Sequence, residues 1–150
     1  MGKINTGRVV LGGLIAGLVF NISEFILNVF VVGKAWESWS MEHQFNAAMG
    51  AGAYIFMIIL MFLLGIFAVW FYAAIRPRYG AGPKTALCAG FALWLVAYLF
   101  PTLGQVGMSM YSFGFAIVSL IWGLVEALLG TYLGAWFYKE DDGTAAAPGM

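Results

Sequence analysis

Two acidic residues lie in stretches of the sequence that are otherwise almost entirely apolar. Glu24 lies in FNISEFILN (20–28), between Asn21 and Asn28, and Glu126 lies in SLIWGLVEALLG (119–130). At about 100° per residue, Asn21, Glu24 and Asn28 fall on one face of a helix. In an apolar setting, such a face predicts a site for a proton, a cation or a small polar ligand.

The two stretches share one pattern. Written one above the other, GLVFNISEFILN (17–28) and SLIWGLVEALLG match in register, with Glu24 over Glu126 and small or amide residues at the same offsets. Glycines lie on the same faces as the acidic residues: Gly13, Gly17, Gly123, Gly130 and Gly134. Because small residues four apart let membrane helices approach closely, we predict that the two faces point inward and pack around a polar pocket.

The expected protonation state follows from the cost of burying a charge. On insertion scales an acidic residue at the centre of a membrane helix costs roughly 2.5–3.5 kcal/mol. Glu24 and Glu126 are therefore expected to be protonated or to share a proton, with Asn21 and Asn28 orienting a ligand. The alternative interpretation, which the sequence leaves open, is that these polar residues only hold helices together by hydrogen bonds. Four aromatic residues near this face are expected to line a cavity or fill the core: Phe20, Trp94, Tyr98 and Trp122.

The elements that position these residues are predicted to be membrane-spanning helices. Of the 150 residues 63% are hydrophobic and 9% are charged, and the mean hydropathy is +0.90, far outside the range of soluble globular domains. Four mostly apolar segments are long enough to span a bilayer: 8–32, 51–75, 85–104 and 113–138. We therefore predict an all-α integral membrane four-helix bundle with antiparallel neighbours over residues 1–138, followed by a disordered polar tail at 139–150.

The cations set the expected orientation. Six of the seven Lys and Arg residues lie on the side of the predicted spans that holds both termini, and only Lys34 lies on the other. By the positive-inside rule, both termini are predicted to face the cytoplasm. The long loop on the outer side places Trp36, Trp39 and His43 at helical spacing, which predicts a short helix lying in the membrane interface. Pro101 is expected to kink or end the third helix.

Other residue types give little support for further chemistry. Glu37, Glu42 and His43 are close in the sequence, but one histidine without another nitrogen or sulfur ligand does not predict a metal site. Ser23 and Ser119 have no histidine within the predicted spans to activate a nucleophile. No cofactor is predicted. No basic run is interleaved with aromatic residues, so nucleic acid is not an expected partner.

Two short motifs resemble those of a known family. FVVGKAW (30–36) follows the first predicted helix, and LGAWFY (133–138) ends the last one. The chain thereby resembles a family of short bacterial four-helix membrane proteins of unknown function, whose members place Gly-Lys-x-Trp after the first helix and end with Gly-Ala-Trp. The resemblance implies the four-helix architecture and no activity. The expected location of the chain is the bacterial inner membrane.

The sequence thus predicts a small membrane protein that binds or transports a proton, a cation or a small polar molecule, with Glu24 and Glu126 as the titrating groups. Its expected partners are the lipid bilayer and either a second copy of the chain or another membrane subunit. One alternative is a non-catalytic assembly subunit whose polar residues only hold helices together. Another is a small membrane enzyme acting on a lipid-like substrate, for which no nucleophile or cofactor site is evident.

Overall fold

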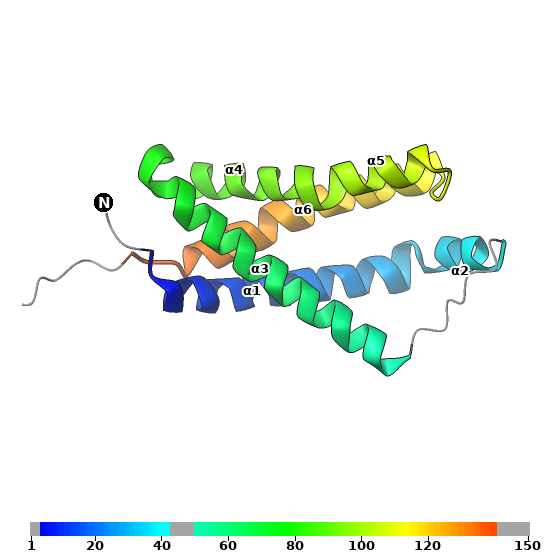
Figure 1. The fold of residues 1–150 in the computed structure, drawn as a ribbon, viewed down its shortest axis with the longest axis horizontal. Helices are drawn as coiled ribbons and strands as arrows, with labels where there is room; N and C mark the ends of the chain where they lie inside the picture. Colours follow the sequence, from blue (N-terminus) through cyan, green and yellow to red (C-terminus); the bar gives the residue numbers. More distant parts are fainter. Residues whose placement is uncertain (1–3, 43–49, 141–150) are drawn as a thin grey trace, which may run out of the picture.

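A computed structural model of the protein describes residues 4–42 and 50–140, and these residues form helices and turns without any strand (Figure 1). The prediction of an all-α chain is confirmed over those residues. Four stretches are long and apolar enough to cross a membrane: Thr6–Val31, Ala51–Tyr79, Pro83–Gly107 and Phe113–Trp136. They overlap the four predicted spans and are compatible with a small membrane protein.

Two of these stretches contain a π-helical turn, in which the backbone bonds join residues five apart. The elements in chain order are α1 (Thr6–Ile26), η1 (Leu27–Val31), α2 (Gly33–Glu42), α3 (Ala51–Tyr79), α4 (Pro83–Trp94), η2 (Leu95–Leu99), α5 (Phe100–Gly107) and α6 (Phe113–Trp136). The first stretch is α1 continued by η1, and the third is α4 continued by η2 and α5. A short helix, α2, lies in the loop where one was predicted, while His43 and residues 141–150 of the predicted tail lie outside the described residues.

Local sequence explains the helix ends. The Asn5 side chain accepts a hydrogen bond from the Arg8 N–H (3.0 Å), which caps α1. Helix α3 continues to Tyr79, four residues beyond its predicted end, and stops at Gly80, whose φ of 85° favours glycine. The third span does not end at Pro101 but continues as helix to Gly107. A π turn comes just before that proline, where the chain lacks an N–H to donate.

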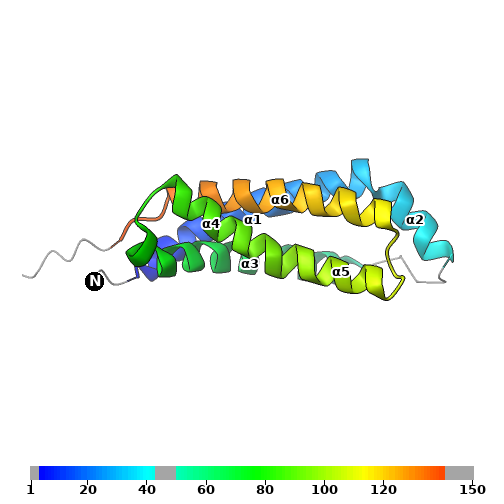
Figure 2. The ribbon, with the colours of Figure 1, turned by 90° about the horizontal axis from the view of Figure 1, so that it is seen from above.

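The helices are arranged so that α1 packs against α3 and α6, and α6 also packs against α4. Figure 1 shows α3 crossing α1 obliquely, and Figure 2 shows the same bundle from above, with both ends of the described chain on one side. We call that side the terminal end. The opposite side, which holds α2 and the turn between α5 and α6, is called the loop end.

Hydrogen bonds and rings tie the helices together at the terminal end. The Tyr138 hydroxyl accepts from the Asn5 N–H (3.4 Å), and the Tyr72 hydroxyl accepts from the Gly82 N–H (3.2 Å). The two tyrosine rings meet edge to face at 6.0 Å, and the Arg76 guanidinium lies 5.6 Å from the centre of the Tyr138 ring. At the terminal end, an aromatic cluster therefore joins α3 to the residues just before α1, just before α4 and just after α6.

The loop end is more open. Residues 54–60 of α3 are each between 37% and 59% exposed, although all seven are apolar or aromatic. Because these seven successive positions cover two turns of helix, every face of this half of α3 carries exposed apolar side chains. A helix with this pattern is stable where lipid covers it, because lipid tails are as apolar as the side chains.

Candidate polar site

Glu126 is the most deeply buried acidic residue described. It lies in the middle of α6, and only 2% of its surface is exposed. The Tyr98 hydroxyl donates a hydrogen bond of 2.6 Å to its Oε1 atom, and the Ser23 side chain lies beside the carboxyl group. Its Oε2 atom is also buried, and no hydrogen-bond partner for it exists among the described residues. One oxygen of this carboxyl group is thus fixed by Tyr98, and the other lies buried near the Ser23 hydroxyl without a hydrogen bond of ordinary geometry.

Two features of the chain bring Tyr98 to Glu126. Tyr98 lies in the π turn η2, where the Phe100 N–H bonds to the Leu95 carbonyl, so its direction is set by a wider turn than an α-helix provides. Gly123 lies opposite, and a Cβ atom at that position would collide with the Tyr98 ring. Because Gly123, one turn before Glu126, has no side chain, the Tyr98 ring has room to reach the carboxyl group.

Glu24 occupies a different environment. It is half-buried on α1, and its Oε2 atom accepts a hydrogen bond of 2.8 Å from the Asn28 side chain. The same Asn28 amide also donates to the Glu24 backbone carbonyl at 2.8 Å. Asn28 is itself exposed, in the π turn η1. The spacing of four residues predicted that these two side chains share a face, and the structure shows that they bond to one another.

Asn21 faces another neighbour. Its amide donates to the Gly17 carbonyl on its own helix (2.8 Å) and to the Ile58 carbonyl of α3 (3.3 Å). It therefore links α1 to α3, and no hydrogen bond of the described residues joins it to Glu24 or Glu126. The four residues predicted to form one site are thus divided between Glu126 on α6, the Glu24 and Asn28 pair on α1, and Asn21 at the contact with α3.

Ser23 and Trp122 connect the two acidic helices. The Trp122 indole N–H donates to the Ser23 hydroxyl oxygen at 2.8 Å, across the contact between α6 and α1. Sequence reasoning considered Ser23 only as a nucleophile and Trp122 only as a ring near the polar face. The sequence could have suggested that Ser23 and Trp122 lie near the two acidic residues, because Ser23 adjoins Glu24 and Trp122 precedes Glu126 by one helical turn.

The two carboxyl groups do not bond directly to one another in the described chain, yet they act on the same surroundings. The Glu24 charge is near enough to act on Glu126, on Tyr98 and on Tyr111 at the loop end. Burial raises the pKa of Tyr111, a hydrogen bond with Gln105 opposes this rise, and the Glu24 carboxylate adds to it. Glu24 is therefore within electrostatic range of both the buried Glu126 and Tyr111 at the loop end.

No described cation neutralises these carboxyl groups. Among residues 4–42 and 50–140 the ion pair found is between Arg76 and Glu140, 3.6 Å apart at the terminal end. The same residues contain no group of three His, Cys, Asp or Glu side chains that could hold a metal ion. The site accordingly offers acidic and hydroxyl groups without a built metal centre.

Glycines bring the helices into close contact on the terminal side of the site. A Cβ atom on Gly134 would lie 2.7 Å from the Gly12 carbonyl oxygen, so α1 and α6 touch through their backbones. Gly13 and Gly17 face α3 instead, where a Cβ atom on Gly17 would lie 2.6 Å from Phe62 Cα. Gly130 accommodates the ring of Phe20, which is fully buried. These contacts close the bundle between the polar site and the terminal end.

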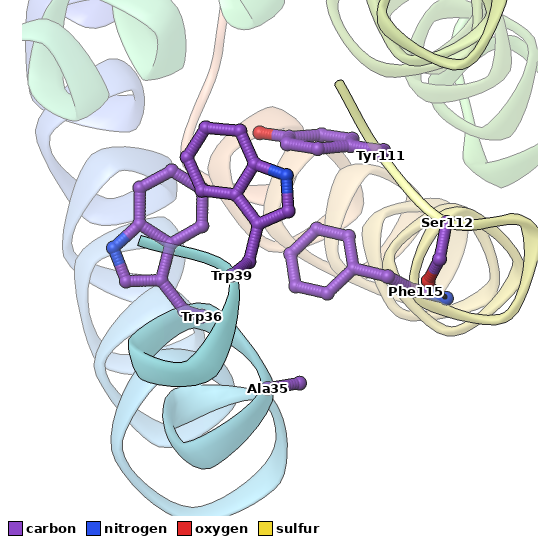
Figure 3. Close-up of a pocket in the computed structure, with 6 residues that line it drawn as sticks. All are labelled: Ala35, Trp36, Trp39, Tyr111, Ser112 and Phe115. Atoms are coloured by element: carbon purple, nitrogen blue, oxygen red, sulfur yellow. Dashed lines mark hydrogen bonds between the residues drawn. The ribbon is translucent and has the colours of Figure 1, made fainter. Parts of the chain in front are cut away.

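Aromatic side chains fasten α2 over the loop end. Figure 3 shows Trp36 and Trp39 of α2 facing Tyr111 and Phe115, with a small pocket of about 50 Å³ among them. The two indole rings stack at 5.0 Å, and Trp36 lies 6.4 Å from both other rings. An open groove of about 400 Å³ on the surface of α4 and α6 is lined by apolar side chains and Tyr132. Neither the pocket nor the groove includes Glu24 or Glu126 in its lining.

No protein-family model matches the chain, and comparison with curated proteins and with solved structures finds none that is similar. The resemblance to short bacterial four-helix membrane proteins therefore stays a prediction. What can be said of function rests on the geometry of the polar site.

Proposed function

We propose that the protein is a small integral membrane protein whose buried carboxyl group, Glu126, takes up and releases a proton, with Glu24 as the second titrating group. One observation carries this proposal. Glu126 is 2% exposed, is bonded by Tyr98 at one oxygen, and has a second oxygen without a donor in the described chain. Ionisable groups kept at mid-depth in a membrane are costly and are functional candidates for that reason.

A proton is the ligand that the surroundings of Glu126 favour over a larger one. A hard cation is bound by six or more oxygen ligands, whereas the described acidic groups form no cluster of three. A proton needs neither a ligand shell nor a cavity, only an oxygen atom with a free lone pair.

Access to the site is proposed from the loop end. The half-buried Glu24 and exposed Asn28 lie toward that end, where the neighbouring half of α3 leaves the bundle. On the other side, backbone contacts at Gly12, Gly134 and Gly17 close the bundle, so transport of the proton across the membrane requires those contacts to open. By the distribution of cations the loop end would be the outer face, so the site would exchange protons with the outside.

The proposal is tested by measuring proton movement in liposomes that contain the purified protein and an internal pH indicator. After an imposed pH step, the protein is expected to accelerate the internal pH change, and Glu126→Gln is expected to remove the acceleration. Glu24→Gln should reduce it. The matched control is Glu37→Gln, the same change at an exposed position on α2, which should leave the rate as it is. An unchanged rate in Glu126→Gln would refute the proposal.

A second function, that of an assembly subunit, is favoured by a separate observation. Four side-chain hydrogen bonds join different helices, those of Asn21, Trp94, Trp122 and Tyr98. The loop half of α3 exposes apolar side chains at every position from 54 to 60. In this case the polar residues hold the bundle while α3 presents a face to another membrane helix. Co-purification of a stable partner, with no proton movement by the protein alone, would support it.

A further inference from the structure

We infer that Tyr98 is a positioning residue for Glu126, and that it assigns different roles to the two carboxyl oxygens. Oε1 is held by the Tyr98 hydroxyl, and Oε2 is the atom that receives the proton. The inference deepens the proposed function, because it rests on Glu126 being the proton-binding group. It adds a residue from another helix and names the atom at which exchange occurs.

The hydrogen bond itself is the first argument. The Tyr98 hydroxyl lies 2.6 Å from Glu126 Oε1, near the short end of the range for O–H···O bonds. Glu126 is buried and Tyr98 is partly buried, and a hydrogen bond away from water is stronger than one at the surface. The bond therefore fixes the rotation of the carboxyl group and keeps Oε2 in one place.

The isolation of Oε2 is the second argument. This atom is buried and has no donor among the described residues, although buried carboxyl oxygens normally have one. The nearby Ser23 hydroxyl accepts the Trp122 indole N–H at 2.8 Å and has a second lone pair that can accept from a proton carried on Oε2. Because Oε1 already accepts from Tyr98, Oε2 is the oxygen that carries the proton, with Ser23 beside it.

The third argument is that two uncommon local features are needed to place Tyr98 beside Glu126. Its ring needs the empty space at Gly123, on the facing helix. It also lies in a π turn, and such turns are rare and frequently occur at functional sites. Ordinary packing of a tyrosine requires neither feature. Both are explained if the hydroxyl group must reach Glu126.

The charged and titratable groups around this carboxyl group come from two other elements. Tyr98 faces it from η2, and Glu24 acts on it from α1. On α6 itself no other titratable side chain lies within one helical turn of Glu126. A change in the infrared absorption of Glu126 on replacing Tyr98 can therefore be separated from an effect of Glu24 by making each change alone.

Infrared difference spectroscopy of the full chain in lipid bilayers tests the inference. Spectra are recorded across a pH range, and the carboxyl band of Glu126 is identified as the band that disappears in Glu126→Gln. In Tyr98→Phe, which removes only the hydroxyl group, this band should move to higher wavenumber because its C=O loses a hydrogen bond. In Trp122→Phe, which removes the neighbouring bond to Ser23, it should stay in place. An unmoved band in Tyr98→Phe, or an equal movement in Trp122→Phe, would overturn the inference.

A second measurement covers the case in which Tyr98→Phe does not fold. Protein made with fluorinated tyrosine keeps every hydroxyl group but makes each a stronger donor, so the Glu126 band should move to lower wavenumber. No movement would count against the bond. If only the proposed function is wrong, the result is different. The infrared bands of Glu126 would then be the same at every pH, but they would still move when Tyr98 is replaced.

Discussion

The close approach of α1 and α3 predicts a large effect for Gly17→Ala. The new Cβ atom would lie 2.6 Å from Phe62 Cα and 2.6 Å from Phe62 Cδ1, whereas ordinary Cβ contacts begin near 3.4 Å. The phenyl ring can rotate away, but the Cα atom belongs to the backbone of α3. The helices must therefore separate by about 0.8 Å at this point, and a gap of that size removes roughly a quarter to a half of the dispersion attraction between the facing atoms.

The expected destabilisation is about 1–3 kcal/mol, the usual range for overpacking, which lowers the folding equilibrium constant about 5- to 150-fold. Part of it arises at the neighbouring bond, since the Asn21 amide reaches the Ile58 carbonyl across the same two helices. The measurement is reversible unfolding in mixed lipid and detergent micelles, followed by helix content and by tryptophan fluorescence.

The matched control is Gly104→Ala in α5, where a Cβ atom would meet nothing within 4 Å. Alanine favours helix over glycine by up to about 1 kcal/mol, so this variant should be as stable as the parent or more stable. If Gly17→Ala unfolds at the same denaturant concentration as Gly104→Ala, the close packing of α1 on α3 is refuted.

Three further predictions concern the site and the loop end. The Ser23 and Trp122 side chains should be coupled by about 0.6 kcal/mol and at most about 1.7 in a double-mutant cycle of Ser23→Ala and Trp122→Phe. Trp36→Ala should speed hydrogen exchange of the α2 amides by removing the stacked rings, whereas Trp136→Ala, 70% exposed at the other end of the bundle, should not. Because burial raises the pKa of Tyr111 above 10.0, its contribution to stability is present at lower pH and is lost as the pH rises beyond that value, so Tyr111→Phe should lose less stability at high pH.

Each of these has an outcome that would contradict it. Additive effects in the cycle would mean that the indole and hydroxyl groups do not interact. Equal exchange rates for α2 in the two tryptophan variants would mean that the ring stack does not hold the helix. If the parent and Tyr111→Phe lose the same stability at high pH, titration of Tyr111 is not the cause of the loss.

The sequence predicted the helices well because length and apolar composition decide them locally. It also placed Glu24 and Asn28 on one face, since a spacing of four residues fixes that relation. It did not predict which neighbour each face meets. Gly13 and Gly17 lie against α3, although the matched pattern suggested packing against the helix that holds Glu126. The rotation of a helix about its own axis depends on all of its neighbours together. The periodicity of one segment gives no information about those neighbours.

The bond between Tyr98 and Glu126 was beyond sequence reasoning for a different reason. A projection at 100° per residue assumes a regular α-helix, and Tyr98 lies in a π turn where that angle no longer holds. Pro101, three residues later, was expected to kink or end the helix. The chain keeps its helix through the proline by widening the turn before it, and this local adjustment sets the direction of the side chain that reaches the carboxyl group.

The crossing of α3 over α1 also has a mechanical consequence. Contacts with α1 hold α3 as far as Ile58, through the close approach of Gly17 to Phe62 and the hydrogen bond from Asn21, so the free arm of α3 begins beyond Ile58. Ala51 lies seven residues from Ile58, a distance of about 10 Å along the helix. A rotation of about 10° at this point would carry the tip of the arm about 2 Å, by the leverage of a rigid rod of that length. Small changes in packing near Ile58 would thus be amplified at the end of the molecule where Glu24 is least covered.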